Sequence, residues 1–178
     1  MPTLDLDTLL ETSKFRIVRT RQEGPGVKTK EREVVRHPGA VAILPLLDDG
    51  RVCLIRNRRL SVDQELIELP AGTLEPGEDP AAAAHRELLE ETGYRADRLT
   101  KLHEFFLSPG ILDERMHLYL AEGLTAGAPK REPGEEIENL LVPWGEAMQM
   151  TLDGRIHDAK TLIGLLLYDR ARGRNGTA

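Results

Sequence analysis

The chain has 178 residues, 40% of them hydrophobic and 30% charged, which fits one globular domain with a substantial core. Its formal net charge of −6 argues against a general nucleic-acid binder, because phosphate contacts require a basic surface. One cysteine, Cys53, rules out a disulfide within the chain, and neither a signal peptide nor an apolar run long enough for a bilayer is evident. We therefore expect a cytoplasmic protein with no membrane partner.

The first part of the chain predicts a small antiparallel sheet. Residues 15–21 and 27–37 are polar and alternating, and the turn between them is assigned to residues 24–26, Gly-Pro-Gly. Because the pair is so polar, we expect it to lie outside the main core. Three more apolar segments then predict buried or half-buried strands, at residues 39–47, 52–56 and 65–69.

The second half begins with a well-punctuated helix at residues 79–93. Asp79 suits the N-cap, Pro80 the first helical position and Gly93 the left-handed position after the helix. Further strands are predicted at residues 102–107, 116–121 and 137–142, and further helices from Trp144 and over residues 158–172. Strands interleaved with few helices predict an α+β fold with a mixed sheet packed between helices.

Three acids on the predicted helix suggest chemistry. Glu87, Glu90 and Glu91 stand three and four residues apart, so their carboxylates fall on one face, where they repel one another unless a cation is present. All-oxygen ligands suit Mg²⁺ or Mn²⁺ rather than zinc. Arg86 is placed to brace this face, for instance by pairing with Glu90. The alternative is a merely solvated acidic surface.

The surrounding residues favour the metal site. The stretch resembles the Nudix box, G-x5-E-x7-R-E-U-x-E-E-x-G-U, in which U is apolar. Matching residues stand at every fixed spacing, and Tyr94 at the final apolar place is the one mild departure: Gly72, Glu78, Arg86, Glu87, Leu88, Glu90, Glu91 and Gly93. A chance match at a given start has a probability on the order of 10⁻⁸ from average residue frequencies.

The resemblance implies an α/β/α sandwich over residues 39–178 that hydrolyses a nucleoside diphosphate linked to a further group. It implies that Glu87 and Glu91 are the main metal ligands, that Glu90 shares the site, and that the Ala71 carbonyl is a further ligand. Two or more Mg²⁺ ions, or Mn²⁺, are expected. Metal ions of this kind polarise a pyrophosphate and activate water for in-line attack.

Other segments resemble the ADP-ribose pyrophosphatase branch of the family: H-P-G-A-V at residues 37–41, E-L-P-A-G at residues 68–72 and S-P-G at residues 108–110. This likeness implies that the substrate is ADP-ribose, a small nucleoside diphosphate sugar, and that the products are AMP and ribose 5-phosphate. By the same likeness Arg59 contacts substrate phosphate and Glu114 lies near the terminal ribose, and Glu68 and Gly110 belong to substrate-binding segments. The forked guanidinium of Arg59 suits that contact, whereas its neighbours Arg56 and Arg58 could be solvated strand-end charges instead.

The resemblance also implies a glutamate that acts as base from a loop before the last strand. Glu135 is the candidate and Glu136 the alternative, while Pro133 stands where some relatives carry another acid. Glu90 is counted with Glu135 as catalytic. A solvated loop acid is the plain alternative.

Residues 1–38 are expected to swap across a homodimer and to help build the adenine pocket, with a monomer carrying an edge flap as the alternative. Two other functions stay open. One is hydrolysis of another sugar nucleotide such as GDP-mannose, and the other is a catalytically silent Nudix module that only binds a ligand.

Overall fold

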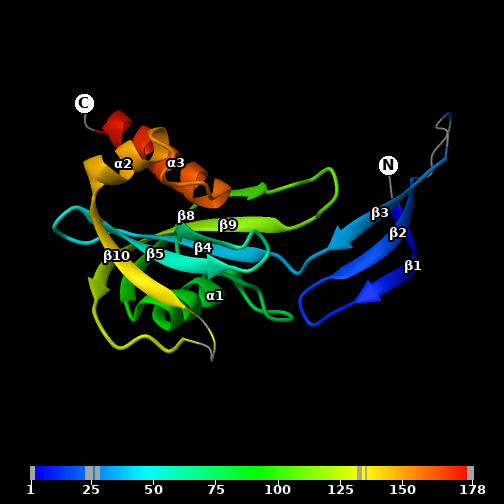
Figure 1. Cartoon of the computed structure of the whole chain (residues 1–178), viewed down its shortest axis with the longest axis horizontal. Helices are drawn as coiled ribbons and strands as arrows, with labels where there is room; N and C mark the ends of the chain where they lie inside the picture. The colour runs from blue at the N-terminus through cyan, green and yellow to red at the C-terminus, as the bar shows by residue number, and fades with distance from the viewer. Residues whose placement is uncertain (1–2, 23–25, 27–28, 132–133, 135, 176–178) are drawn as a thin grey trace.

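The body of the molecule is a pair of β-sheets between helices, in a computed structural model that describes residues 3–22, 26, 29–131, 134 and 136–175 (Figure 1). In the four-stranded sheet, β4 (Ala40–Pro45) runs parallel to β9 (Arg115–Thr125) and antiparallel to β7 (Ala71–Thr73). The long strand β8 (Arg95–Phe106) completes it at the edge. This sheet is mixed, as the sequence predicts.

The second sheet has three antiparallel strands. Its centre is β5 (Arg51–Arg59), which lies between β10 (Ile137–Pro143) and β6 (Gln64–Glu68). An isolated bridge pairs Leu46, the residue after β4, with Val52 of β5 and so links the two sheets. In this antiparallel pair Arg59 is opposite Gln64 and Glu68 is opposite Ile55, so the long Arg59 side chain reaches back along β6 to contact Glu68.

Helices cover the two faces of this body (Figure 1). On one face, α1 (Pro80–Glu87) packs against Val41 and Ile43 of β4. On the other, α2 (Trp144–Leu152) and α3 (Ala159–Asn175) cover a larger core that includes Ala42 and Leu44. Since successive side chains of a strand point to opposite faces, β4 supplies side chains to both cores, as β9 also does, and β4 is buried throughout.

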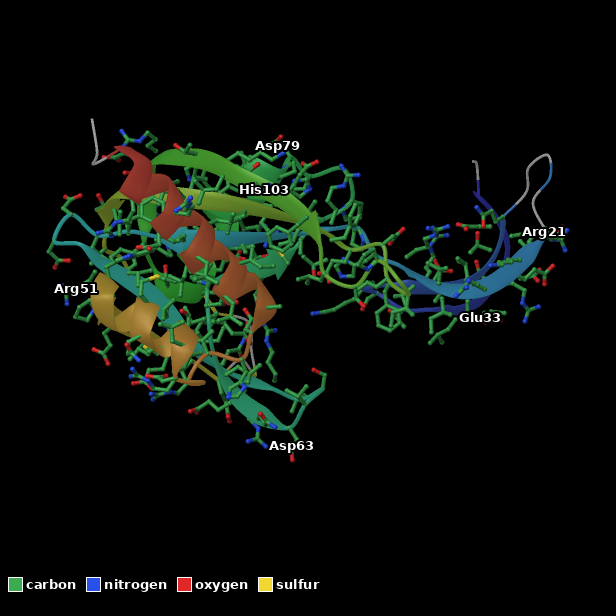
Figure 2. The ribbon with its side chains drawn as sticks, turned by 90° about the horizontal axis from the view of Figure 1, so that it is seen from above. Arg21, Glu33, Arg51, Asp63, Asp79 and His103 are labelled. Carbon is green, nitrogen blue, oxygen red and sulfur yellow. The ribbon has the colours of Figure 1, made fainter. Side chains whose placement is uncertain are left out.

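The N-terminal sheet projects from one end of the body (Figures 1 and 2), with Arg21 and Glu33 on the projecting part. It contains β1 (Thr3–Glu11), β2 (Arg16–Gln22) and β3 (Lys30–Arg36). The S-P-G loop holds its base: Val35 N–H donates to the Ile111 carbonyl at 2.8 Å and Asp113 N–H to the Val35 carbonyl at 3.1 Å. The small sheet is thereby hydrogen-bonded to the loop between β8 and β9.

The predicted architecture, an α/β/α sandwich with a separate N-terminal antiparallel sheet, is confirmed. Three details differ. Strand β1 was not predicted, because its described side chains are exposed and give no buried pattern. Strand β8 begins at Arg95 rather than at residue 102, since its polar first half pairs with β9. Residues 24 and 25 of the predicted turn lie outside the described residues. No helix within the described ranges combines the length and the apolar character needed to cross a membrane.

Candidate active site

A cavity of about 410 Å³ lies where α1 and the helical turn after it, strand β7 and the N-terminal sheet approach one another. Three segments of the body line it: residues 71–76, the helical residues 86–91 that face it, and the end of β5. The turn between β1 and β2 contributes Ser13 and Lys14. The three predicted metal-binding glutamates, Glu87, Glu90 and Glu91, all line this cavity. Arg59 and Arg86 line it as well.

The N-terminus of α1 is fixed by the residues that the sequence singles out. The Asp79 carboxylate accepts hydrogen bonds from Ala81 N–H at 2.9 Å and Ala82 N–H at 3.1 Å, and Pro80 takes the first helical position. Ala83 and Ala84 pack against the sheet. The opposite face of the helix is therefore the one that carries acids into the cavity.

The second half of the predicted helix is not α-helical. Residues Leu88–Thr92 form a π-helical turn that ends at Gly93, whose φ is +82°. Thr92 Oγ1 donates to the Leu88 carbonyl at 2.5 Å and accepts from Tyr94 N–H at 3.1 Å, so the threonine competes for a helical carbonyl. Single π turns inside helices recur at functional sites. This turn carries Glu90 and Glu91.

Arg86 organises the acidic face. Its guanidinium donates to Glu78 at 2.9 and 2.8 Å, to Glu87 at 2.6 Å and to Glu90 at 3.1 Å. The predicted pairing of Arg86 with Glu90 is confirmed. The hydrogen bond to Glu78 is the largest influence on Arg86 and holds the guanidinium pKa well above its usual value. Arg86 therefore remains a fixed positive charge among acids that would otherwise repel one another.

Gly72 is required by the close approach of Glu87. A Cβ atom at this residue would lie 1.9 Å from the Glu87 carboxyl carbon, which is far inside any allowed contact. Beside it, Ala71 N–H donates to Glu91 Oε2 at 2.9 Å, and Glu91 is almost fully buried. The backbone of β7 and two of the three glutamates are thus in direct contact.

The oxygen atoms of these glutamates and of the β7 backbone suit a hard divalent cation. They are carboxylates and a backbone carbonyl, the oxygen ligands that Mg²⁺ and Mn²⁺ prefer. Within the described ranges, however, no three acidic, histidine or cysteine side chains are already grouped closely enough to enclose an ion. Glu87 and Glu90 are turned toward Arg86 instead.

Arg59 and Glu68 form a pair at the edge of the cavity. Arg59 donates from Nε and Nη2 to the two oxygens of Glu68, both at 2.7 Å. Glu68 is fully buried, and Lys160 Nζ approaches its Oε2 at 2.5 Å. Arg59 lines the cavity, whereas Glu68 does not. The predicted phosphate-binding arginine is therefore at the site, with the predicted glutamate beneath it.

Gly110 and Glu114 lie in the loop that binds the N-terminal sheet. Gly110 is exposed, and Glu114 Oε1 is 3.7 Å from Nδ1 of His37. Neither residue lines the cavity of the three box glutamates. Within one chain, the structure therefore does not bring these two predicted substrate-binding residues to the acidic cavity.

The loop before β10 and the strand β10 itself are both hydrogen-bonded to the π turn. Lys130 N–H donates to the Glu90 carbonyl at 2.9 Å, Arg131 Nε to the Glu91 carbonyl at 3.1 Å, and Asn139 Nδ2 to the Thr92 carbonyl at 2.8 Å. These donors satisfy carbonyls that the end of a helix leaves free. Glu135, the predicted base, and Pro133 lie outside the described residues, and Glu136 is exposed just before β10.

Sequence reasoning missed several residues at the site. Ser13, Lys14 and Asn57 line the cavity, and Lys160 supports Arg59 through Glu68. None belongs to the box, and Lys160 lies 92 residues from Glu68, so no local pattern indicates the contact. Cys53, by contrast, behaves as expected of a buried strand residue: burial raises its thiol pKa to about 12, which leaves it neutral and unreactive.

Comparisons with known proteins agree with this geometry. The NUDIX domain model matches residues 36–163. An ADP-ribose pyrophosphatase of Bacillus subtilis is 43% identical over 145 residues, covering 80% of this chain and 78% of the relative. A GDP-mannose pyrophosphatase of Cronobacter sakazakii is 37% identical over 163 residues, covering 86% and 84%. A crystal structure described as an ADP compounds hydrolase superposes with a TM-score of 0.83 over 99% of this chain and 96% of the other, at 22% identity.

Proposed function

The chain belongs to the NUDIX family of pyrophosphatases, and on that premise we propose that it hydrolyses the pyrophosphate bond of ADP-ribose to AMP and ribose 5-phosphate. One observation carries the proposal. A single cavity gathers the box glutamates, the backbone of β7 and Arg59, which are the groups needed to bind a diphosphate through metal and arginine. The 43% identity to a protein named ADP-ribose pyrophosphatase favours that sugar nucleotide.

Glu87, Glu91, Glu90 and the Ala71 carbonyl would hold two or more Mg²⁺ or Mn²⁺ ions. Such ions, when bound, neutralise the diphosphate and lower the barrier to attack of water on phosphorus. Arg86 keeps Glu87 and Glu90 oriented. Glu135 or, alternatively, Glu136 would accept the proton of the attacking water.

The remaining groups of the cavity would orient the substrate. Arg59 keeps Nη1 without a partner among the described residues, so it can donate to a phosphate oxygen. Lys14 has no ion pair in the described part of the chain and enters the cavity from the N-terminal sheet. Its ammonium group would add a further positive charge beside the diphosphate.

GDP-mannose is the second candidate substrate, because a relative named GDP-mannose pyrophosphatase is 37% identical over 86% of the chain. The two candidates share the diphosphate and the metal-binding groups. They differ in the nucleobase and in the sugar, which the box residues do not contact in this proposal. A direct comparison of the two substrates therefore decides between them.

The deciding experiment is a hydrolysis assay of the purified protein with ADP-ribose and GDP-mannose, with product identification. We expect AMP and ribose 5-phosphate from ADP-ribose, loss of activity with a chelator and recovery with Mg²⁺. Glu91→Gln preserves the acceptor for Ala71 N–H but removes the charge, so kcat should fall on the order of 100-fold or more.

Glu146→Gln, an exposed change on α2, is the matched control and should retain the wild-type rate. Absence of metal-dependent cleavage of ADP-ribose, with rapid turnover of GDP-mannose, would establish the second candidate instead.

We also propose that the active form is a homodimer joined through the N-terminal sheets. Three leucines of β1, namely Leu6, Leu9 and Leu10, support this proposal. In a monomer each of them is 40 to 48% exposed. Exposed apolar residues gathered on one edge strand are typical of an interaction surface. A partner subunit could also bring its Gly110 and Glu114 segment toward the cavity, which the same chain does not do.

A further inference from the structure

Arg59 is a cation of the cavity whose orientation depends on a fully buried carboxylate, that of Glu68. Among the described residues, both hydrogen bonds of Arg59 go to Glu68, and Glu68 in turn is held by Lys160 from the first turn of α3. Lys160 is almost fully buried, and its Nζ also lies 2.9 Å from Oδ1 of Asp158. A chain of contacts thus runs from the C-terminal helix to the cavity.

We infer that Lys160 is a positioning residue for Arg59: it fixes the Glu68 carboxylate so that the Arg59 guanidinium presents its remaining N–H groups to the substrate diphosphate. The identity of the ligand as a diphosphate depends on the proposed function. The contacts of Glu68 with Lys160 and Arg59 are observed in the structure and do not depend on it.

Geometry is the first support. Glu68 Oε2 accepts from Arg59 Nη2 at 2.7 Å and from Lys160 Nζ at 2.5 Å, so two donors determine how the carboxylate is rotated. Arg59 binds both oxygens through its planar fork, so its plane follows the plane of Glu68. The rotation that Lys160 imposes on the carboxylate is therefore passed on to the guanidinium.

Charge is the second support. The cluster holds two cations, Arg59 and Lys160, and two anions, Glu68 and Asp158, so its formal charge is zero. Without Lys160 the cluster would carry one net negative charge beside the cavity that has to accept a diphosphate. Unpaired charges in a buried environment interact strongly, so this loss would weaken the attraction of Arg59 for phosphate.

The attachment of α3 is the third support. Asp158 caps the helix by accepting from Thr161 N–H at 2.9 Å, and Thr161 Oγ1 accepts from Leu69 N–H at 2.7 Å. Gly164 lets the helix pack closely, because a Cβ there would lie 2.6 Å from Leu69 Cδ1. These contacts hold Lys160 at a fixed place relative to Glu68, as a positioning residue requires.

The test needs no substrate in its first part. The Nε–H signal of Arg59 is followed by ¹⁵N NMR and assigned by its absence in Arg59→Met. In the wild type, the hydrogen bond to Glu68 should protect this proton from exchange with water. In Lys160→Met we expect exchange to be at least tenfold faster, whereas Lys101→Met, an exposed lysine of β8, should leave it unchanged. An equally protected proton in Lys160→Met would overturn the inference.

The second part measures kcat and KM with ADP-ribose and Mg²⁺. Lys160→Met should reduce kcat/KM about tenfold or more, as displaced binding groups commonly do. The double variant Arg59→Met/Lys160→Met should have the same kcat/KM as Arg59→Met alone, because Lys160 acts through Arg59. Additive losses would show that Lys160 acts by another route, and full activity of Lys160→Met would also contradict the inference.

A milder variant covers the case in which Lys160→Met does not fold. Asp158→Asn keeps the helix cap but removes the charge that faces Lys160, so it should also speed exchange of the Arg59 proton, by a smaller factor. Unchanged exchange in Asp158→Asn, with Lys160→Met unfolded, would count against the inference. Failure of ADP-ribose as a substrate of the wild type would contradict the proposed function alone.

Discussion

Gly72 shows how a single residue sets the geometry of this site. Its missing side chain leaves the space that the Glu87 carboxylate occupies, with 1.9 Å between an added Cβ and the carboxyl carbon. The φ of Gly72 is not in the left-handed region, so the requirement is one of space and not of backbone conformation. Any side chain at this residue has to displace Glu87 from strand β7.

We predict that Gly72→Ala abolishes most of the activity, reducing kcat on the order of 100-fold, because Glu87 must leave its place against the backbone. The protein should still fold, since the displaced group is the end of a side chain that can rotate. Activity assays and thermal unfolding measured together check both statements.

Gly145→Ala is the matched control for Gly72→Ala. This glycine lies in α2, has no heavy atom within 4 Å of an added Cβ and should gain up to about 1 kcal/mol in stability with unchanged activity. A Gly72→Ala enzyme with normal kcat would contradict the assigned role of this close approach.

At the scale of elements, the loop of residues 74–79 is fastened to α1 by the ion pair of Glu78 and Arg86. The hydrogen bonds of Arg86 are the main influence on Glu78, and they hold the pKa of this carboxyl below its usual value. A lowered folded pKa means that the charged form stabilises the fold. That stabilisation is complete above the unfolded pKa of about 4.3 and is lost as pH falls through the lower folded value.

We therefore predict that Glu78→Gln destabilises the protein at neutral pH, on the order of 1 kcal/mol for a lost charged hydrogen bond. The difference in unfolding free energy from the wild type should shrink as pH falls below 4.3 or so. Denaturant unfolding at several pH values measures it. Glu75→Gln, an exposed neighbour with no ion pair within the described ranges, should show little difference at any pH, and a constant deficit in Glu78→Gln would refute the linkage.

Local signals in the sequence predicted some of these elements well and could not predict others. Asp79, Pro80 and Gly93 mark the ends of the box helix because capping chemistry acts within a few residues. The π turn was not predicted, because the spacing of the glutamates in the Nudix box is equally compatible with a continuous α-helix. The support of Arg59 by Lys160 was also missed, because folding alone brings α3 to β6.

At the scale of the whole molecule, the projecting N-terminal sheet is the part that one chain leaves uncovered. Its edge strand β1 exposes leucines along its length, and the turn that follows carries Ser13 and Lys14 into the cavity. A second subunit that covered these leucines would therefore hold the turn in place. The turn of residues 12–15 would then couple assembly of the dimer to catalysis.

We predict a dimer of the wild type by sedimentation, and a shift toward monomer in Leu9→Lys/Leu10→Lys, with a dissociation constant raised at least about 100-fold by buried charge. The control Leu152→Lys changes an exposed leucine of α2 and should leave the dimer intact. A wild-type protein of monomer mass at micromolar concentration would refute the proposed assembly.

The E-L-P-A-G segment at residues 68–72 is held by a different neighbour at each of its first four residues. Glu68 binds Arg59 and Lys160, Leu69 N–H binds Thr161, the Pro70 carbonyl accepts from Ile43, and Ala71 N–H binds Glu91. Inserting or deleting one residue there would shift every one of these partners at once. Protein engineers who want to alter loop length should therefore leave this stretch untouched and vary the turn between β5 and β6, residues 60–63, where Asp63 stands clear of the body (Figure 2).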